Sequence, residues 1–385
     1  MKTLSGLKSL CLGTALLVPG IIPTAASAQD NATGVAHTQR ATTHMLPPGY
    51  DCRDCGQPDG VAAPNPPANF NPLTASDDQI AFFGFPPRPD AGKAPDAYAF
   101  WKKLVTLPVK RIQPTLRATR IKHGPARNVS IAEPNLPPSP TGGASTNWSG
   151  YAIVDNNNPF KGAKTYIYGI LEVPVAQQAF NTCNGTWDYS SPWVGFDGTG
   201  GSGDVLQAGF DVDAYCNGGN TSTTYAAWYE WFPAGSVYLT NFPLAPGDVI
   251  YVYVWPSSTT VGNYYIANVT QNVSSSTQFN APSGTSLVGN AAEWITEWFA
   301  GPMITNYLDI PWQDARAVLP NRTQYSPGKA PTGTVYSITL EDGSGNQLSK
   351  AYLTPNNALT YVDPNNKSHT SAGSTLWFQT EGLAR

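Results

Sequence analysis

Two glutamates four positions apart, Glu293 and Glu297, lie in the tryptophan-containing stretch AAEWITEWFAG at residues 291–301. On a β-strand, residues i and i+4 point to the same face, so both carboxylates could line one cleft. A glycosidase places two such acids on either side of a glycosidic bond. About 13 Å of strand would separate the two backbones at ~3.3 Å per residue, which is long for a retaining pair. The alternative is one glutamate that activates a water molecule beside a neutral hydrogen-bond donor.

Histidine is scarce in the part of the chain that could hold an active site. After residue 140 the only histidine is His369, in the polar stretch NNKSHTSAG. A Ser/His/Asp or Cys/His mechanism would need this residue as its base. Zinc hydrolases usually need two or three histidine ligands, and no HExxH motif occurs. The glycine-rich stretch 197–204 lacks the lysine and the helix of a phosphate-binding loop. We therefore expect carboxylates and amides to carry any catalysis, with no cofactor and no metal.

The first 28 residues have the three parts of a secretory signal. Lys2 and Lys8 supply positive charge, an apolar run covers residues 10–22, and Ala-Ser-Ala at 26–28 offers a cleavage site. A membrane anchor is the other interpretation, but two prolines interrupt the run and no other segment is long enough to span a bilayer. We expect a secreted protein.

Cysteine usage agrees with export. One of the five cysteines, Cys11, leaves with the signal, so four remain. Cys52 and Cys55 form a CxxC among prolines and glycines, where a local disulfide or two free thiols is more plausible than a redox or zinc site. Cys183 and Cys216 could bridge two loops of the later domain, although sequence does not prove the pairing.

Residues 29–140 are expected to be a poorly structured pro-region. Within it, residues 101–130 carry eight lysines and arginines and no acid. From residue 141 onward, 8 lysines and arginines stand against 17 aspartates and glutamates, a net charge of −9. A basic arm beside an acidic domain can lie across it and inhibit it, and acid or salt would weaken the contact. A flexible linker with a solvated charge run is the alternative. We expect maturation between Arg127 and Ser145.

The region 141–385 is rich in short runs of Val, Ile, Tyr, Thr and Trp. Each run, such as TYIYGILEVPV or DVIYVYVW, is bounded by Gly, Pro, Asn or Ser, and several alternate apolar with polar residues. This pattern is typical of antiparallel strands, and no amphipathic helix of convincing length appears in this region. The sequence therefore predicts an all-β fold, an antiparallel sandwich of two large sheets of the jelly-roll or concanavalin-like kind.

Several separate motifs then resemble the glutamic peptidases, the eqolisin family (peptidase family G1) of secreted acid proteases. The blocks that carry the resemblance are TNWSGYAIV (146–154), SPWVGFDG (191–198), VLQAGFD (205–211), AAWYEWFP (226–233) and AEWITEWF (292–299). The resemblance implies a Gln/Glu pair on a β-sandwich. It places the glutamine at Gln207 and the glutamate at Glu297, with Glu293 as the alternative carboxylate. At the positions of Trp298 and Ala300, relatives commonly have acidic residues. This difference affects the substrate subsites that the resemblance implies.

Physical roles follow for the residues of these blocks. Glu297 would remove a proton from water, which attacks the peptide carbonyl, and Gln207 would donate to the oxyanion. A further set is expected to tune the site or bind substrate: Asp197, Asp211, Trp193, Trp228, Glu230, Trp231, Glu293 and Phe299. For the tryptophans the alternative role is ordinary core, and for the aspartates and Glu230 it is a loop-capping or solvated carboxylate.

The predicted function is a secreted acid endopeptidase made as a self-inhibited precursor. Its partners would be protein or peptide substrates and its own basic pro-segment, with no nucleic acid and no membrane, and it would be a monomer. Two other classes stay open. One is a carbohydrate-active sandwich, either a glycosidase using Glu293 and Glu297 or a lectin-like module. The other is a non-catalytic adhesin. A two-domain aspartic protease would need two D-[TS]-G blocks, and only DGTG at 197–200 comes close.

Overall fold

The computed structural model describes Pro47, Tyr50, Cys52 and residues 54–131, 141–179, 182–331, 334–353, 360–362, 368–370 and 376–380. The predicted signal peptide, residues 1–28, lies outside the described residues. Among the described residues, no helix has both the length and the apolar character needed to cross a bilayer.

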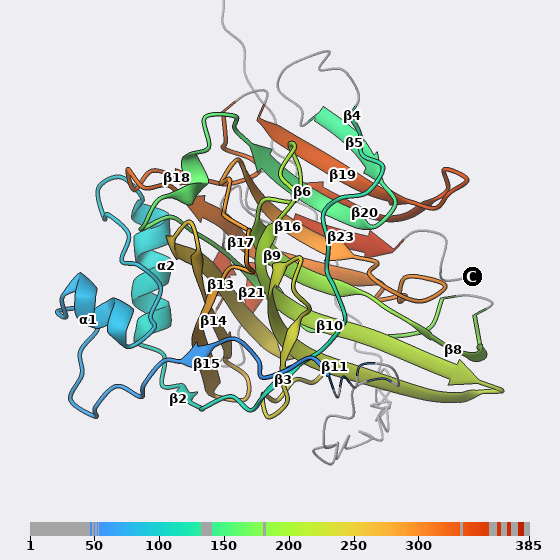
Figure 1. Cartoon of the computed structure of the whole chain (residues 1–385), viewed down its shortest axis with the longest axis horizontal. Helices are drawn as coiled ribbons and strands as arrows, with labels where there is room; N and C mark the ends of the chain where they lie inside the picture. The colour runs from blue at the N-terminus through green and yellow to red at the C-terminus, as the bar shows by residue number, and fades with distance from the viewer. Residues whose placement is uncertain are drawn as a thin grey trace, which may run out of the picture. The chain divides into compact units, whose positions relative to one another are not determined.

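Two layers of antiparallel strands form a sandwich, as predicted (Figure 1). The first layer runs in the order β12 (Val237–Leu239), β11 (Asn220–Phe232), β10 (Val205–Asn217), β9 (Ser191–Phe196), β16 (Ala291–Glu297), β6 (Trp148–Val154) and β19 (Val335–Glu341). The second runs β15 (Val273–Asn280), β14 (Val261–Asn268), β13 (Val249–Ser258), β7 (Tyr166–Glu172) and β17 (Asp309–Val318). Strands β23 (Leu376–Thr380) and β20 (Gln347–Leu353) join β17 to β19, so one hydrogen-bonded ladder passes through both layers.

Shorter elements extend these layers. They are β1 (Val61–Ala62), β2 (Lys110–Arg111), β3 (Leu116–Ala118), β4 (Ser130–Ile131), β5 (Thr141–Ser145), β8 (Asn184–Asp188), β18 (Gln324–Tyr325), the separate pair β21 (Thr360–Val362) and β22 (Ser368–Thr370), and the 3-10 turn Pro159–Lys161. Within the described ranges two pairings are parallel, β2 with β15 and β5 with β19.

Strand alternation explains why both faces of the second layer are buried. In β13, Ile250, Val252 and Val254 point into the sandwich core, where they meet residues of β9, β10 and β16. The intervening Tyr251 and Tyr253 point the other way, because successive side chains of a strand alternate. A strand that is apolar on both faces needs a cover on each side.

A helix of the predicted pro-region supplies the outer cover. Helix α2 (Pro95–Val105) starts on a proline and has two lysines in its last turn, both favourable positions. Its Phe100 stacks on Tyr168 of β7 with ring centroids 4.8 Å apart and planes 5° apart. A shorter helix, α1 (Asp77–Phe82), has a capping box at Ser76. The stretch expected to have little regular structure therefore contains two helices, and α2 is buried on the second layer (Figure 1).

Several ion pairs join an acidic residue of the pro-region to a basic residue of the sandwich. This is the reverse of the expected contact between a basic pro-region and an acidic domain. Asp77 of the pro-region pairs with Lys164 at 3.2 Å and with Arg322 at 3.4 Å. Asp96 pairs with the buried Arg316 at 3.2 Å. In these pairs the acid comes from the pro-region, because Lys164, Arg316 and Arg322 of the sandwich lie next to Asp77 of α1 or Asp96 of α2. Hydrophobic contact under α2 and these ion pairs together hold the segment on the second layer.

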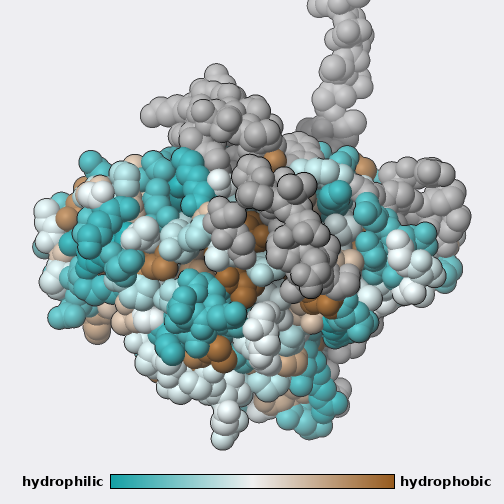
Figure 2. Space-filling model, turned by 90° about the horizontal axis from the view of Figure 1, so that it is seen from above, coloured by the Kyte–Doolittle hydropathy of each residue, from teal (hydrophilic) through white to brown (hydrophobic). Residues whose placement is uncertain are grey.

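On the face seen in Figure 2, hydrophobic residues are interrupted by hydrophilic ones. The large hydrophobic side chains that are exposed among the described residues include Val61, Phe82 and Leu308, which belong to separate parts of the chain.

Candidate active site

One outer face of the first layer gathers the candidate residues. Gln207 on β10 is the direct cross-strand neighbour of Gly195 on β9 and of Glu230 on β11. Glu293 on β16 is the neighbour of Gly195 from the other side. Directly paired residues project to the same face of a sheet, so Gln207, Glu230 and Glu293 lie in one row across four strands.

Residues two and four positions along the same strands extend this face. Glu297 on β16 is therefore on it, together with Trp193 of β9, Asp211 of β10 and Trp228 of β11. All of these side chains are buried.

The basic segment of the pro-region covers this face. Strand β3 pairs with β12, and the chain then crosses the row between β3 and β4 (Figure 1). The amide Nε2 of Gln207 donates to the backbone carbonyl of His123 at 2.5 Å. The next backbone N–H, that of Gly124, donates to Oε1 of Glu297 at 3.2 Å. One peptide bond of the chain, His123–Gly124, thus has its carbonyl on Gln207 and its amide on Glu297.

Glu297 is held by the sandwich as well as by the pro-segment. Trp193 Nε1 donates to Oε2 at 3.1 Å, and Asn147 Nδ2 donates to Oε1 at 3.2 Å. Burial raises the pKa of Glu297 to about 7, against the lowering effects of His123 and of the hydrogen bonds from Gly124 and Trp193. A carboxyl with this pKa carries its proton in acid.

Glu293 is different. It is fully buried, and among the described residues neither of its carboxylate oxygens has a hydrogen-bond partner. Burial, with Asp197 and Asp204 nearby, raises its pKa well above the ordinary value. Buried polar atoms are nearly always paired, so two unpaired carboxylate oxygens call for an explanation.

The imidazole of His123 fills a pocket beside this row. Nε2 lies 3.2 Å from Asp211 Oδ1, and Nδ1 lies 3.1 Å from Glu230 Oε2. The ring stacks on Trp228 with centroids 3.8 Å apart and planes 2° apart, and Phe299 packs at 4.4 Å. Burial lowers the pKa of His123, but the two carboxylates outweigh burial and raise it to about 10. The histidine is therefore an imidazolium held by two acids.

Two of the predicted site residues lie elsewhere. Asp197 accepts hydrogen bonds from the backbone N–H groups of Val288, Gly289 and Asn290, so it caps a loop. Burial raises its pKa to about 6. Trp231 does not line the cleft with Trp228: it belongs to the sandwich core, where its indole donates to Asp204. The correction follows from alternation, because adjacent residues of β11, Glu230 and Trp231, must face opposite sides.

Sequence reasoning did not single out His123 or Asn147. His123 is the only histidine of the basic segment 101–130, and it precedes Gly-Pro, a sequence with little side-chain bulk after the histidine. This isolated position in the basic segment was the one sequence signal that could have pointed to His123. Asn147 lies in the TNWSGYAIV block (146–154), and its place in that block was the available signal. Both disulfides, Cys52–Cys55 and Cys183–Cys216, are present.

Groups of three or more potential metal ligands do not occur among the described residues. His369, the other candidate base, lies on β22, which pairs only with β21 in a small separate sheet of the described chain.

Known proteins match part of this chain. The curated relatives include scytalidopepsin B of Scytalidium lignicola, 30% identical over 183 residues, which are 48% of this chain and 60% of the relative. Aspergillopepsin-2 of Aspergillus niger is 27% identical over 175 residues, 43% of this chain and 61% of the relative. The matches thus span about three fifths of these relatives' own length.

Solved structures with a similar course include scytalido-glutamic peptidase with a peptide-based transition state analog. It has a TM-score of 0.45 and 20% identity, and the match covers 61% of this chain and 98% of that one. Aspergilloglutamic peptidase from Aspergillus niger has a TM-score of 0.39 and 24% identity, over 50% and 99% of the two chains. The model of the Peptidase A4 family matches residues 146–361, more than half of the chain. The chain belongs to the Peptidase A4 family.

Proposed function

We propose that this protein is a secreted acid endopeptidase that hydrolyses peptide bonds with a glutamine and a glutamate, and that it is made as a self-inhibited precursor. The observation that carries the proposal is the His123–Gly124 peptide bond, whose carbonyl is on Gln207 and whose amide is on Glu297. A peptide bond in contact with an amide donor and a carboxylate is what a hydrolytic site of this kind must bind. Membership of a peptidase family supports the same activity.

Gln207 is the oxyanion donor in this proposal. Its Nε2 already contacts a peptide carbonyl oxygen, which becomes the oxyanion when water adds. One well-placed donor of this kind contributes about 3 kcal/mol to the transition state. An amide does not titrate, so it keeps its donor in acid. The Oε1 of Gln207 has no partner among the described residues and can accept from the attacking water.

For the general base we propose Glu293, the alternative that the sequence left open, rather than Glu297. Gln207 and Glu293 stand on either side of Gly195, with their backbones about 10 Å apart, two inter-strand spacings of ~4.8 Å. Gly195 has no side chain to separate them. The oxygens of Glu293 are unpaired among the described residues, whereas those of Glu297 accept from Trp193 and Asn147. Glu293 is thus the carboxylate with acceptors available for a water molecule.

The proposed step is ordinary hydrolysis. Glu293 as carboxylate takes a proton from water while the water oxygen bonds to the carbonyl carbon. The carbon–nitrogen bond then breaks, and the leaving nitrogen takes a proton from the carboxylic acid. Glu297 holds the amide on the leaving side in this proposal, and its hydrogen bond from Gly124 N supports that role. Removal of the pro-segment lets water reach these carboxyls, which lowers the pKa values that burial has raised.

Proteolysis of a denatured protein at pH 3–4 tests the dyad, with the full chain first incubated in acid. Gln207→Ala and Glu293→Gln should each lower kcat by about 100-fold or more. Glu297→Gln should mainly raise KM, because its proposed contact is with the bound substrate. Pepstatin-type and chelating inhibitors should leave the wild type active.

Other results would point elsewhere. Full activity in Glu293→Gln with loss in Glu297→Gln would return the base to Glu297. Hydrolysis of a polysaccharide without peptide cleavage would instead make the protein a glycosidase.

Self-inhibition rests on the same contacts. While residues 119–127 cross the site, a substrate cannot reach Gln207. Burial raises the pKa of Glu230, so acid protonates this carboxylate and removes one of the charges that hold the imidazolium of His123. For secretion, the N-terminus of the protein recovered from the medium of an expressing host should be Gln29. An uncleaved N-terminus retained in cells would contradict export.

A further inference from the structure

Arg111 of β2 is a buried cation that has no acidic partner among the described residues. It is 8% exposed. Burial lowers the pKa of its guanidinium, and the groups that act in the opposite direction belong to Tyr265, so no carboxylate of the described chain compensates the charge. Arg316, which is also buried, pairs with Asp314 at 2.5 Å and with Asp96 at 3.2 Å. A buried charge without a counter-ion is costly, so the charge of Arg111 calls for an explanation.

The contacts that Arg111 makes position its guanidinium. Nη1 donates to the backbone carbonyl of Phe83. Cζ lies 4.6 Å from the ring centroid of Phe85 and 5.6 Å from that of Tyr265, which are cation–π contacts. Among the described residues these contacts supply no negative charge. The planar fork of five N–H donors binds a carboxylate best, through two parallel hydrogen bonds.

A cavity of about 460 Å³ adjoins this guanidinium. Arg111 lines it, and its apolar walls include Phe70, Leu104 and Leu107. None of the described residues that line the cavity is acidic. Small-molecule sites have volumes of about 300–1,000 Å³, mostly apolar walls and a few polar groups. The cavity has the size and the composition of such a site.

The pro-region and the sandwich meet at this cavity. Residues within 65–111 supply most of the lining, and Tyr265 of β14 and Ser274 of β15 come from the sandwich. The backbone N–H of Ile112 donates to the carbonyl of Ser274 at 2.9 Å, which continues the pairing of β2 with β15. Both β14 and β15 belong to the second layer, whereas Gln207 lies on the first. The cavity is therefore separate from the candidate active site.

We propose that this cavity binds a monocarboxylate with an apolar body, such as a fatty acid of medium chain length, with its carboxylate on Arg111. The head carries one negative charge, which matches the one buried cation of the lining, because the other cation, Lys110, is exposed. The hydrocarbon body covers the apolar walls. Binding of this kind is independent of the proposed peptidase activity.

Other classes of small molecule fit the cavity less well. A neutral apolar molecule leaves the guanidinium of Arg111 without a counter-ion, and an amphiphilic amine adds a second positive charge beside it. A small inorganic anion compensates the charge but leaves the apolar walls uncovered.

A bound carboxylate would touch both the pro-region and the sandwich. A ligand that binds the folded chain but not the unfolded one stabilises the folded state by mass action. We therefore expect the ligand to hold the segment around β2 on the second layer.

The first arm of the test is calorimetric titration of the full chain at pH 7 with octanoate, 1-octanol, octylamine and acetate. One octanoate should bind per chain, with an affinity about tenfold or more above that of 1-octanol and octylamine, the size expected for charge-assisted hydrogen bonds. Acetate should bind about tenfold or more weaker than octanoate, because it lacks the apolar body. Absence of saturable octanoate binding, or equal affinities for octanoate and 1-octanol, would overturn the proposal.

Two variants locate the site. Arg111→Met should weaken octanoate binding by about tenfold or more and leave 1-octanol binding unchanged. Ala68 is exposed and lines the cavity, so Ala68→Trp should fill it and weaken both ligands without a change at Arg111. If Arg111→Met does not fold, Ala68→Trp and the comparison with 1-octanol still decide. Wild-type octanoate affinity in either folded variant would place the binding elsewhere and contradict the proposed site.

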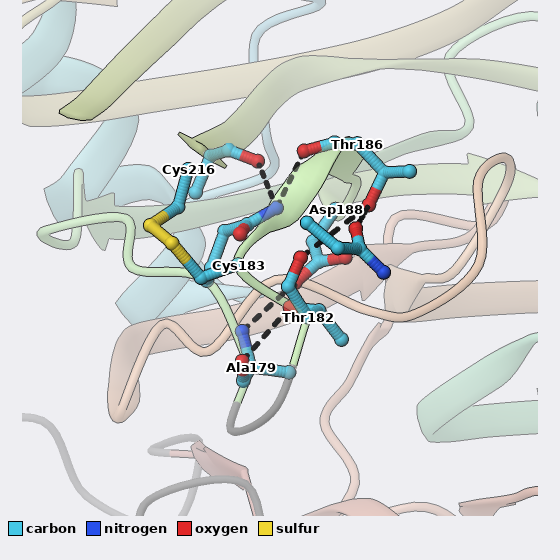
Figure 3. The surroundings of a disulfide bond; sticks show 9 residues. Ala179, Thr182, Cys183, Thr186, Asp188 and Cys216 are labelled. Carbon is cyan, nitrogen blue, oxygen red and sulfur yellow. Dashed lines mark hydrogen bonds between the residues drawn. A yellow bond between two sulfur atoms is a disulfide. The ribbon is translucent and has the colours of Figure 1, made fainter. Parts of the chain in front are cut away.

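A control removes a buried charge far from β2 in the sequence. Asp188 accepts from Ala179 N at 2.8 Å and from Thr182 Oγ1 at 2.6 Å, beside the Cys183–Cys216 disulfide (Figure 3). Asp188→Asn should bind octanoate with the affinity of the wild type. A loss as large as that of Arg111→Met would show that the effect comes from general destabilisation and would count against the site.

Thermal unfolding provides the second arm. Octanoate at about 100 times its Kd should raise the Tm of the wild type by about 3 °C or more, and should raise that of Arg111→Met less. Arg322 also faces the pro-region, through Asp77, but does not line the cavity. Arg322→Met should therefore keep the full increase in Tm. An equal increase in Arg111→Met and the wild type would overturn the role of the buried guanidinium.

Discussion

Gln207 and Glu293 are cross-strand neighbours of the same glycine, Gly195, one on each side of β9. A glycine between them leaves the space above the central strand open to two long polar side chains. The relationship links a sequence feature, the glycine of the SPWVGFDG block, to the two groups that we propose do the chemistry.

A methyl group at this glycine should disturb the site. A Cβ at Gly195 would lie 2.9 Å from Cβ of Gln207 and 2.9 Å from the carbonyl oxygen of Leu206, closer than side chains pack. Gly195→Ala should therefore displace the amide and lower kcat by about 100-fold, as small misplacements of catalytic groups do. The comparison is Gly142→Ala, where a Cβ meets nothing within 4 Å. Equal kinetics for the two variants would mean that the spacing across β9 does not matter.

His123 should matter more for self-inhibition than the exposed basic residues of the same segment. Its ring lies between two carboxylates and is fully buried, whereas Arg120 pairs with Asp54 through exposed side chains. Exposed ion pairs contribute little, about 0–1 kcal/mol. In the full chain near pH 6, His123→Ala should raise hydrolysis of a small peptide by about tenfold or more, and Arg120→Ala should change it less than twofold. The reverse order would favour a diffuse electrostatic arm over a seated histidine.

The pKa of Glu297 predicts a pH-dependent stability. Burial raises this pKa from 4.5 to about 7 in the closed chain. A group whose pKa is raised on folding contributes stability that is fully present below its unfolded pKa and is lost as pH rises through the folded value. The loss between about pH 4.5 and pH 7 should amount to about 3 kcal/mol for this group.

The measurement for Glu297 is the free energy of unfolding at several pH values between 4 and 8. Glu297→Gln carries no charge at any of them, so its stability curve should be flatter than that of the wild type by this amount. Parallel curves for the two proteins would show that the carboxyl is not ionised in this range.

The two disulfides should differ in their effect on stability. Cys183 and Cys216 are 33 residues apart and tie the loop before β8 to β10, whereas Cys52 and Cys55 close a loop of three. In the chain-entropy account a loop of this length is worth about 4 kcal/mol, and a short loop less. The double variant Cys183→Ser/Cys216→Ser should lose this amount in denaturant unfolding, and Cys52→Ser/Cys55→Ser should lose less. Equal losses would mean that loop length does not set the effect.

Much of the fold was available from the sequence, because strand alternation and turn residues are local signals. The short runs of β-branched and aromatic residues after residue 141 predicted an antiparallel sandwich, and the structure has one. The motif blocks, read with the single histidine after residue 140, directed attention to Gln207 and the two glutamates of β16. Strand alternation alone also indicates that Trp231 and Glu230 lie on opposite faces of β11. The tryptophan-rich pattern nevertheless led us to expect Trp231 at the site, whereas it lies in the sandwich core.

The composition of the pro-region, by contrast, did not reveal its structure. Helix α2 is stable where it packs on Tyr168 and its neighbours, and that aromatic surface exists only once β7 and β13 lie side by side. The net charges of the two regions suggested a basic arm on an acidic domain. Several of the ion pairs are of the opposite polarity, because individual side-chain positions decide them and overall charge does not.

By itself the sequence determined the strands, the family blocks and the types of residue that could do chemistry. Only the tertiary structure decided which residues meet. Gln207 and Glu293 are 86 positions apart and become neighbours through register across Gly195, while His123 reaches Asp211 and Glu230 from a segment that lies outside the sandwich. The reason is that strand register and the docking of a segment depend on contacts between distant parts of the chain, which no local pattern encodes.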